Sequence, residues 1–273
     1  MTQPPLFTAD DWGLSPGVND GILDLATAGV VRRVSCMANG GYVEHRLRDL
    51  LAIPHLELGL HFNVTFERPD SCEPMYESLV GQDGGFRSFR EHLLRSFGPG
   101  RLPLMNEMNW AMRSQLKRLT GLGVTVAYVD GHHHAHLVPG VLEACKEVLL
   151  EHGIRSMRLP LDLRLLVSRK APVYWLAWWN RSKLKANGMV ARRCIYPTQR
   201  RLERVVRNPS LLSRWGGCEV ITHPAKVLDF DSSGVEDSYR TGRLEEYRLL
   251  MGLAPRILSD AAQRSPGASG IRS

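Results

Sequence analysis

The chain has 273 residues and a mass of 30.7 kDa, enough for one large domain or at most two with a sizeable core. Its 43% hydrophobic and 23% charged residues are close to the average for folded globular proteins, which excludes wholesale disorder and the collagenous and membrane classes. A formal net charge of +7 and a pI of about 9.4 make the chain basic, although both signs of charge are present.

The N-terminal residues and the cysteines indicate the compartment. The start MTQPPLFTADD has neither the basic nor the apolar region of a signal peptide. The apolar aromatic stretch at residues 173–179 is far shorter than the roughly 20 residues that a transmembrane helix needs. The five cysteines are scattered and form no C-x-x-C pair, which favours free thiols over a disulfide or zinc framework. We therefore expect a cytoplasmic protein.

Short apolar runs typical of strands alternate along the chain with longer runs at helical spacing. The pattern predicts strands at residues 6–9, 34–38, 56–64, 124–129, 154–159 and 218–222. It predicts helices at residues 18–28, 43–52, 105–120, 138–152 and 243–250. Residues 65–103 are rich in turns, and residues 161–214 follow no clear pattern. The alternation of strand and helix predicts an α/β fold with a parallel sheet.

The chain contains no repeat and no linker clean enough to divide it. We therefore predict a single domain at residues 1–264, with a basic, tryptophan-rich insertion at about residues 161–214. The small and polar residues SPGASGIRS at 265–273 predict a flexible tail.

Polar residues that can bind metals follow several of the predicted strands. Asp10 and Asp11 follow the first strand, His61 lies near the end of the third, a histidine cluster at residues 132–136 follows the strand at 124–129, and His223 follows the strand at 218–222. In parallel α/β folds the carboxyl ends of the strands meet at one edge, where catalytic groups gather. We expect these side chains to share a site.

The acid pair and His61 also have structural interpretations. Adjacent residues of a regular strand point to opposite faces, so Asp10 and Asp11 share a site only if the strand turns into a loop there, and Gly13 supplies that freedom. One carboxylate can then bind a metal while the other acts as a base. The alternative is a helix cap or loop acid pair. Strand alternation places His61 on the face opposite Leu60, either as a ligand or as a hydrogen-bonded core residue.

The segment DGHHHAH at residues 130–136 carries four of the ten histidines. It is internal and therefore not a tag. Neutral imidazole is the commonest metal ligand near neutral pH. One or two of these histidines would complete a facial His-His-Asp site with Asp11 and His61 and leave positions open for water and substrate. Mg, Zn, Mn and Co all occupy mixed nitrogen and oxygen sites, so the ligand types do not select the ion.

Together these motifs resemble a known family. TADDWGLSPGVN at residues 8–19, GLHF at 59–62, DGHHHAHLVP at 130–139 and THP at 222–224 are similar to the motifs of the YdjC-like carbohydrate deacetylases, also called the ChbG/HpnK family. They occur in family order over most of the chain. The resemblance implies a distorted (β/α), TIM-like barrel that hydrolyses the N-acetyl group of an amino sugar. We find no closing strand in residues 254–273, so we expect the barrel to be incomplete at its C-terminal end.

The resemblance also implies roles for single residues. The ligands of a divalent metal ion, Mg or Zn, would be Asp11, His61 and His132, with Asp10 as general base and His223 as general acid. Amide hydrolysis needs an activated water, a stabilised oxyanion and a protonated leaving amine, and this set can supply all three.

The remaining histidines of the cluster have two interpretations. The resemblance implies that His134 and His136 lie behind the ligands or face the substrate. The choice of His132 rather than His136 as the third ligand stays open.

The positive charge is local. Residues 155–215 contain 15 Lys or Arg and two acids, whereas the rest of the chain contains 20 basic and 26 acidic residues. The same segment holds four of the six tryptophans, and residues 175–185 have the composition of an interfacial amphipathic element. Three interpretations of this segment are open. It is a solvated basic face whose tryptophans pack in the core, a site for an anionic substrate or a membrane surface, or a nucleic-acid site.

The sequence thus predicts a metal-dependent hydrolase that removes the N-acetyl group of an amino sugar, whether free, phosphorylated, nucleotide-linked or lipid-linked. We expect an anionic or lipid-linked substrate, peripheral contact with the inner face of the membrane, and no nucleic-acid partner; a homodimer stays open. The alternatives are a metal-dependent phosphoesterase and a lipid-binding or nucleic-acid-binding module with a degenerate site.

Overall fold

A computed structural model of the chain describes residues 4–69, 76–162, 166, 171–229 and 239–255. The predicted tail at residues 265–273 lies outside this part of the chain. Most of the segment in which we find no closing strand, residues 254–273, also lies outside it. The proposed division into one domain and a tail therefore stays a prediction.

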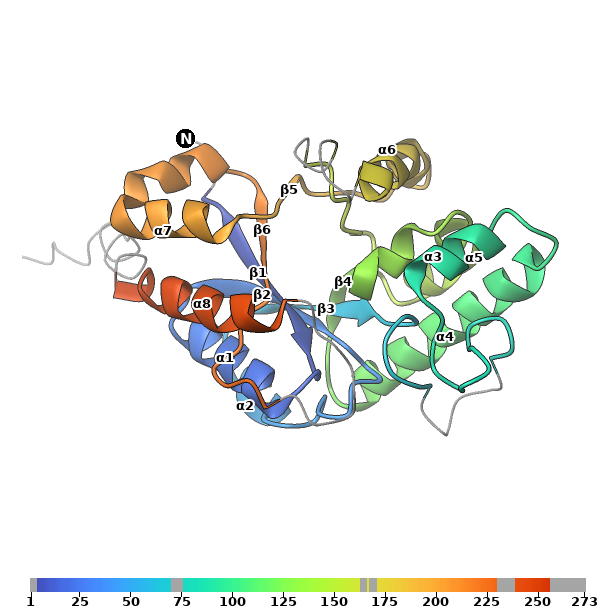
Figure 1. Ribbon diagram of the computed structural model, residues 1–273, viewed down its shortest axis with the longest axis horizontal. Coiled ribbons are helices and arrows are strands. Elements are labelled where there is room, and N and C mark those ends of the chain that lie inside the picture. The colour runs from blue at the N-terminus through green and yellow to red at the C-terminus, as the bar shows by residue number, and fades with distance from the viewer. Residues whose placement is uncertain (1–3, 70–75, 163–165, 167–170, 230–238, 256–273) are drawn as a thin grey trace, which may run out of the picture.

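Six parallel strands form one curled sheet (Figure 1). They are β1 (Leu6–Trp12), β2 (Val31–Cys36), β3 (Glu57–Phe62), β4 (Val126–Gly131), β5 (Cys194–Ile195) and β6 (Glu219–Thr222). Their order is β4-β3-β2-β1-β6-β5, so the N-terminal strand lies near the middle. This confirms an α/β fold, and the regular strands form a half-barrel rather than a complete TIM barrel.

The helices surround the sheet (Figure 1). They are α1 (Pro16–Thr27), α2 (Leu47–Leu51), α3 (Phe89–Arg95), α4 (Arg101–Gly121), α5 (Val141–Glu151), α6 (Ala171–Ala186), α7 (Gln199–Arg207) and α8 (Arg240–Met251), with the 3-10 turns η1 (His132–Leu137) and η3 (Pro209–Trp215). None of the described helices is long and apolar enough to cross a membrane.

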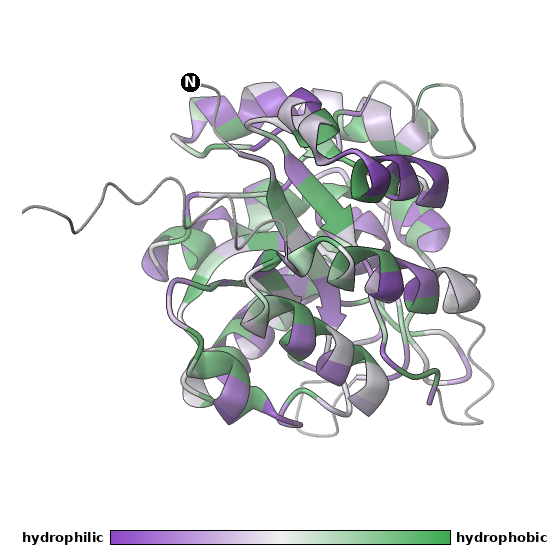
Figure 2. Ribbon diagram, turned by 90° about the vertical axis from the view of Figure 1, so that its left-hand side faces the viewer, coloured by the Kyte–Doolittle hydropathy of each residue, from purple (hydrophilic) through white to green (hydrophobic). Residues whose placement is uncertain are grey.

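The core lies between the sheet and the helices. Trp12, Phe62 and Tyr128 are among the largest fully buried side chains. Figure 2 shows the central strands mostly in hydrophobic colours, whereas the helices alternate hydrophobic and hydrophilic residues. Burial on both faces is typical of a parallel sheet covered by helices. At Gly59 an added Cβ would meet the ring of Tyr128 at 2.4 Å, so the strand needs glycine for this ring to fit.

The predicted helix at residues 43–52 is shorter in the structure, where α2 begins only at Leu47. The side-chain amide of Asn19 donates hydrogen bonds to the carbonyl oxygens of Tyr42 and His45, and the indole of Trp12 donates one to the carbonyl of Val43. These carbonyls bind side chains from β1 and α1, so the segment before α2 folds as turns. Tertiary contacts therefore override the local helical pattern.

The predicted strand at residues 154–159 forms single bridges instead of a regular strand. Met157 bridges to Val129 of β4, and on the other side Ser156 bridges to Val190 and Leu159 to Arg193. This segment therefore lies between β4 and the residues that lead into β5. It carries one strand-end side chain, Arg158, to the same edge of the sheet as the predicted site.

The two segments without a clear pattern contain further elements. Residues 65–103 include α3, which starts with a capping box in which Ser88 and Glu91 bind each other's backbone. Residues 161–214 contain α6, β5, α7 and η3, so the predicted insertion supplies a strand to the sheet.

Candidate active site

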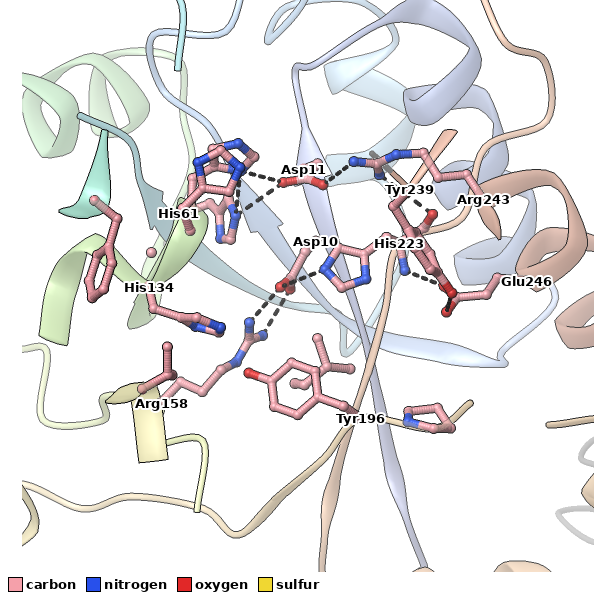
Figure 3. Close-up of a pocket in the computed structure, with 17 residues that line it drawn as sticks. Asp10, Asp11, His61, His134, Arg158, Tyr196, His223, Tyr239, Arg243 and Glu246 are labelled. Carbon is pink, nitrogen blue, oxygen red and sulfur yellow. Dashed lines mark hydrogen bonds and ion pairs between the residues drawn. The ribbon is translucent and has the colours of Figure 1, made fainter. Parts of the chain in front are cut away.

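The structure brings the five predicted site residues to one pocket at the carboxyl ends of the strands. Asp10 and Asp11 come from β1, His61 from β3, His132 from the turn after β4, and His223 follows β6 (Figure 3). The pocket has a volume of about 470 Å³, which is enough for a sugar unit. The expectation that strand ends would gather these side chains is met.

Asp11 itself provides the bend that lets both adjacent acids face the pocket. Its φ is +73°, in the left-handed region, and the pairing of β1 with β2 shifts between Ala9 and Trp12. One extra residue on β1 at this point is a β-bulge, a feature that redirects side chains near active sites. The sequence predicts that Gly13 supplies this freedom. Gly13 also has a positive φ of +103°, but it lies beyond the bulge.

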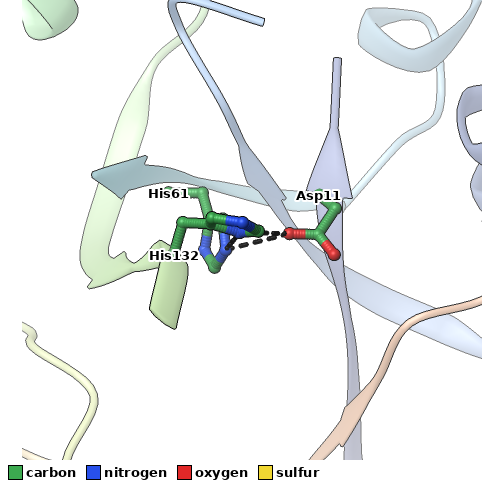
Figure 4. Close-up of side chains that lie close together, drawn as sticks. All are labelled: Asp11, His61 and His132. Atoms are coloured by element: carbon green, nitrogen blue, oxygen red, sulfur yellow. Dashed lines mark hydrogen bonds and ion pairs between the residues drawn. The ribbon is translucent and has the colours of Figure 1, made fainter. Parts of the chain in front are cut away.

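Asp11, His61 and His132 form a compact buried group (Figure 4). Asp11 Oδ1 lies 3.1 Å from His61 Nε2 and 3.0 Å from His132 Nδ1, and the two nitrogens are 3.4 Å apart. Ligand atoms about 2.1 Å from one ion lie about 3.0–3.4 Å from each other in octahedral or tetrahedral sites. The three donor atoms therefore fit a single divalent cation.

The surroundings of His61 also suit a cation. His61 Nδ1–H donates to Asp130 Oδ1 at 2.6 Å, which turns the Nε2 lone pair toward Asp11. Burial lowers the pKa of His61, but the charge of Asp130 and the contact with Asp11 outweigh it and raise the pKa to about 10. The carboxylates on both sides of the ring thus favour positive charge at this point.

Counted without the histidines, the buried arginines and carboxylates around the group leave one negative charge in excess. The network contains three guanidinium groups and four carboxylates, all at most 4% exposed: Arg33, Arg158, Arg243, Asp10, Asp11, Asp130 and Glu219. Burial raises the pKa of Asp11, but the charge of Arg243 and the contacts with His132 and His61 hold it well below its ordinary value. Asp11 is therefore ionised and able to bind a cation.

A second group of possible ligands is less suitable. Donor atoms of Asp10, His61 and Asp130 also lie within 4.8 Å of one another. However, Arg158 binds both Asp10 and Asp130, with 2.6 Å between its Nη2 and Asp130 Oδ2. Arg158 thus occupies oxygens of both carboxylates of this second group, whereas Arg243 binds only Oδ2 of Asp11 and leaves Oδ1 to the two histidines, which favours the group around Asp11.

Asp10 is held by a forked contact with Arg158. Arg158 Nη1 donates to Asp10 Oδ2 at 2.6 Å, and Nη2 donates to Oδ1 at 2.9 Å. Glu219 anchors the same guanidinium from the other side at 3.0 and 3.1 Å. The forked pair fixes the orientation of the carboxylate.

His223 lies across the pocket from the histidine group. Its Nε2 is 3.9 Å from Asp10 Oδ2, and its side chain is 31% exposed, the most accessible of the five predicted residues. The backbone N–H of His223 donates to Glu246, and its ring contacts the ring of Tyr239 edge-on. Arg243 Nη2 donates to Asp11 Oδ2 at 2.7 Å. Helix α8 therefore positions Asp11 and His223, whereas Arg158 holds Asp10.

The structure separates the histidines of the cluster. His132 contacts Asp11 and His61, whereas His136 Nε2–H donates to the backbone carbonyl of Arg158 at 2.9 Å. Burial lowers the pKa of His136 to about 4, so this ring is neutral. His133 and His134 line the pocket in left-handed conformations, with φ values of 48° and 64°. The geometry therefore favours His132 over His136 as a ligand.

Three further residues that line the pocket are not predicted as site residues from the sequence. Arg158 belongs to the basic segment at residues 155–215. Its position at the end of a predicted strand, in Arg-Leu-Pro, is a local indication that its side chain lies at the site edge of the sheet. Arg243 and Glu246 are three residues apart on one face of the last predicted helix, and this spacing is also visible in the sequence. Their partners are distant in sequence, so only the fold reveals these contacts.

Comparisons with known proteins assign the fold and the motifs to a family. The family model described as YdjC-like protein matches residues 6–258. A carbohydrate deacetylase of Geobacillus stearothermophilus is 30% identical over 268 residues, which cover 97% of this chain and 95% of the relative. A human carbohydrate deacetylase is 36% identical over 169 residues, which cover 59% of this chain and 51% of the human protein. With several other carbohydrate deacetylases the match spans from half to 63% of their length.

A solved structure has the same fold. It is an Enterococcus faecalis protein described as a cellobiose-phosphate cleavage protein, with a TM-score of 0.65 and 19% identity, and the match covers 96% of this chain and 95% of that one. At this identity the similarity concerns the fold alone. The family match, in contrast, runs through every described strand and helix, and it shows that the chain belongs to the YdjC-like family.

Proposed function

We propose that this protein is a metal-dependent hydrolase that removes the N-acetyl group of an amino sugar. One observation carries the proposal: a buried Asp-His-His group lies in the same pocket as the Arg158-bound carboxylate of Asp10 and the imidazole of His223. The full-length match to a relative named carbohydrate deacetylase supports the substrate class.

Asp11, His61 and His132 would hold a divalent cation, Mg or Zn. When bound, such a cation polarises the amide carbonyl and lowers the pKa of a coordinated water. Asp130 orients the His61 ring for this role through its hydrogen bond to Nδ1. The mixed donor set binds either ion, so the ion has to be identified by experiment.

Asp10 would accept the proton of the attacking water. Arg158 occupies one lone pair on each carboxylate oxygen, and each oxygen keeps a second lone pair for a proton. Because the guanidinium is itself held by Glu219, the carboxylate cannot turn away from the pocket. Positioned bases of this kind contribute about two to four orders of magnitude in rate.

His223 would deliver a proton to the nitrogen of the departing amine. Its Nε2 lies 3.9 Å from Asp10 Oδ2, so a base and an acid border the same space. The contacts with Glu246 and Tyr239 fix the backbone and the ring face of this residue. Protonation matters because an amide otherwise expels a poorly stabilised amine anion.

Tyr196 is a further group that would contact substrate. Its hydroxyl is buried, has no hydrogen-bond partner within the described parts of the chain, and points into the pocket (Figure 3). An unpaired buried donor is costly unless a ligand satisfies it. We propose that it donates a hydrogen bond to the sugar or to its acetyl group.

Replacing Tyr196 with Phe should lower kcat/KM about tenfold, because one hydrogen bond to substrate is lost. The melting temperature should stay the same or rise, because the substitution removes an unpaired hydroxyl. Tyr42→Phe, at an exposed position away from the pocket, is the matched control. Unchanged kcat/KM in Tyr196→Phe would exclude the contact.

Removing divalent ions tests the reaction class. We expect acetate release from at least one N-acetyl sugar, complete loss of release with EDTA, and recovery when Mg or Zn is added back. The screen includes free, phosphorylated, nucleotide-linked and lipid-linked sugars. Release of phosphate instead of acetate would favour a phosphoesterase, and no EDTA-sensitive release from any substrate would contradict the proposal.

A further inference from the structure

Helix α6 carries three exposed tryptophans on one side. Trp175 and Trp178 are each 57% exposed and Trp179 is 49% exposed, and we call these three residues the tryptophan face. The opposite side of the helix is buried and packs on the protein: Val173, Leu176, Ala177, Asn180 and Leu184. Asn180 donates a hydrogen bond to the carbonyl of Leu137 in η1. The tryptophan face is thus turned outward by the way α6 packs.

Three solvent-exposed tryptophans on one helix are unusual for a protein surface. Tryptophan buries more apolar surface than other side chains and is seldom left in water, so a cluster of exposed indoles marks a contact surface. The sequence by itself leaves open whether these tryptophans pack in the core. The structure excludes that for Trp175, Trp178 and Trp179, whereas Trp215 is buried.

Positive charge borders the tryptophan face. Arg181 and Lys185 follow it on α6 and are exposed, and Arg155 lies beside Gly188 just after the helix. Helix α6 contains no acidic residue, and Glu143 of α5 is paired with Lys183. Within the described parts of the chain, Arg181 and Lys185 have no acidic partner. An aromatic face beside such cations complements a lipid surface whose phosphates lie above an apolar interior.

Helix α6 also contributes a side chain to the wall of the pocket. Val173, in the first turn of α6, lines the pocket beside Tyr196 and His134. Figure 1 shows α6 at the periphery of the molecule, away from the helices α7 and α8. A partner that binds the tryptophan face therefore contacts a helix whose buried side lines the pocket.

We propose that the tryptophan face docks on an anionic lipid bilayer. The indoles insert among the headgroups and the ester region, and Arg181 and Lys185 contact the lipid phosphates. With 16 residues and basic side chains at its end, α6 lies in the plane of the surface. Because Val173 on the other side of the same helix lines the pocket, docking would hold the pocket near the membrane surface.

Two other occupants fit less well. A symmetric dimer through this face would bring together two basic surfaces, and α6 contains no acidic residue to neutralise them, which is repulsive. Single-stranded nucleic acid stacks on open ring faces. Here Trp175 and Trp178 meet edge to face, with centroids 6.2 Å apart and planes at 80°, so one indole blocks a face of the other.

Vesicle flotation tests the proposal with the intact protein. We expect binding to vesicles of phosphatidylcholine mixed with phosphatidylglycerol, weaker binding to phosphatidylcholine alone, and loss of binding at high salt. Trp178→Ala should lower the partition coefficient several-fold, and the triple variant Trp175→Ala, Trp178→Ala, Trp179→Ala should lower it more than tenfold. Trp110→Ala on α4, where the indole is 50% exposed, is the matched control and should bind like the native protein.

Charge reversal gives a second, independent variant. Arg181→Glu combined with Lys185→Glu should abolish the preference for anionic vesicles, whereas Lys117→Glu at an exposed position of α4 should keep most of it. Circular dichroism melts confirm that each variant is folded. Equal vesicle binding by the triple tryptophan variant, or no binding of the native protein, would overturn the proposal.

If the proposal fails, two further measurements identify which other partner binds the tryptophan face. A dimer in light scattering that the tryptophan substitutions dissociate would assign the face to a second copy. Oligonucleotide binding that is lost in the same variants, without vesicle binding, would assign it to nucleic acid. None of these readouts uses enzymatic activity, so their outcome is separate from that of the proposed deacetylation.

Discussion

Asp10→Asn should lower kcat for acetate release by about two to four orders of magnitude while the protein still binds a divalent cation. The amide of Asn cannot accept the proton from water, but its oxygen still accepts a hydrogen bond from Arg158. Arg158 also keeps Glu219 and Asp130 as partners, so the substitution should leave the fold intact. Steady-state kinetics and metal content after dialysis measure the two properties separately.

The matched control for Asp10→Asn is Asp49→Asn, which removes the same charge at an exposed position of α2. Its kcat should equal that of the native protein. Metal content equal to the native value together with near-normal turnover in Asp10→Asn would rule out the base role. Loss of metal in Asp10→Asn would instead assign Asp10 to the ligand group with His61 and Asp130.

His61→Ala should abolish both metal binding and turnover. It removes one of three donor atoms that lie 3.0 to 3.4 Å apart, and two ligands do not hold a divalent ion tightly. We expect the metal affinity to fall by more than about a hundredfold, since loss of a residue that only supports a ligand already costs 10–100-fold. Turnover should fall by about a thousandfold or more, because polarisation by the ion contributes several kcal/mol.

The control for His61→Ala is His152→Ala, at an exposed position at the end of α5. Calorimetric titration with Zn or Mg compares the two variants. His132→Ala supplies an independent test, since it removes a different donor of the same group and should have the same effect. Native metal affinity in both His61→Ala and His132→Ala would show that the ion is bound elsewhere.

The sequence predicts the α/β fold and brings candidate site residues to one edge of the sheet, but it does not predict every element around them. Asp10, Asp11, His61 and His223 each lie at or just after the end of a strand whose period is visible locally, and parallel strands bring their carboxyl ends to one edge. The predicted strands and helices of the first half are present with shifted ends. The predictions are wrong for segments whose structure depends on contacts with residues distant in sequence. Helix α2, for example, is shorter than predicted because Asn19 and Trp12 bind the carbonyls of the segment before it.

Some features depend on contacts that no local pattern encodes. Arg158 pairs with Asp10, which is 148 positions away, and Arg243 pairs with Asp11 across 232 positions. The choice between His132 and His136 depends on the left-handed turn at His133 and His134, which sends one ring to Asp11 and the other to a backbone carbonyl.

Composition and motifs alone establish a basic α/β protein with an Asp and His site at the strand ends and a resemblance to one family. This much is local, because strand period, ligand chemistry and motif spacing are properties of short segments. Which side chains pair in the buried network, and whether the tryptophans face the core or the solvent, depends on how α6, α8 and residues 154–159 pack against the sheet. Only the tertiary structure decides those contacts, because burial and pairing arise between residues far apart in the chain.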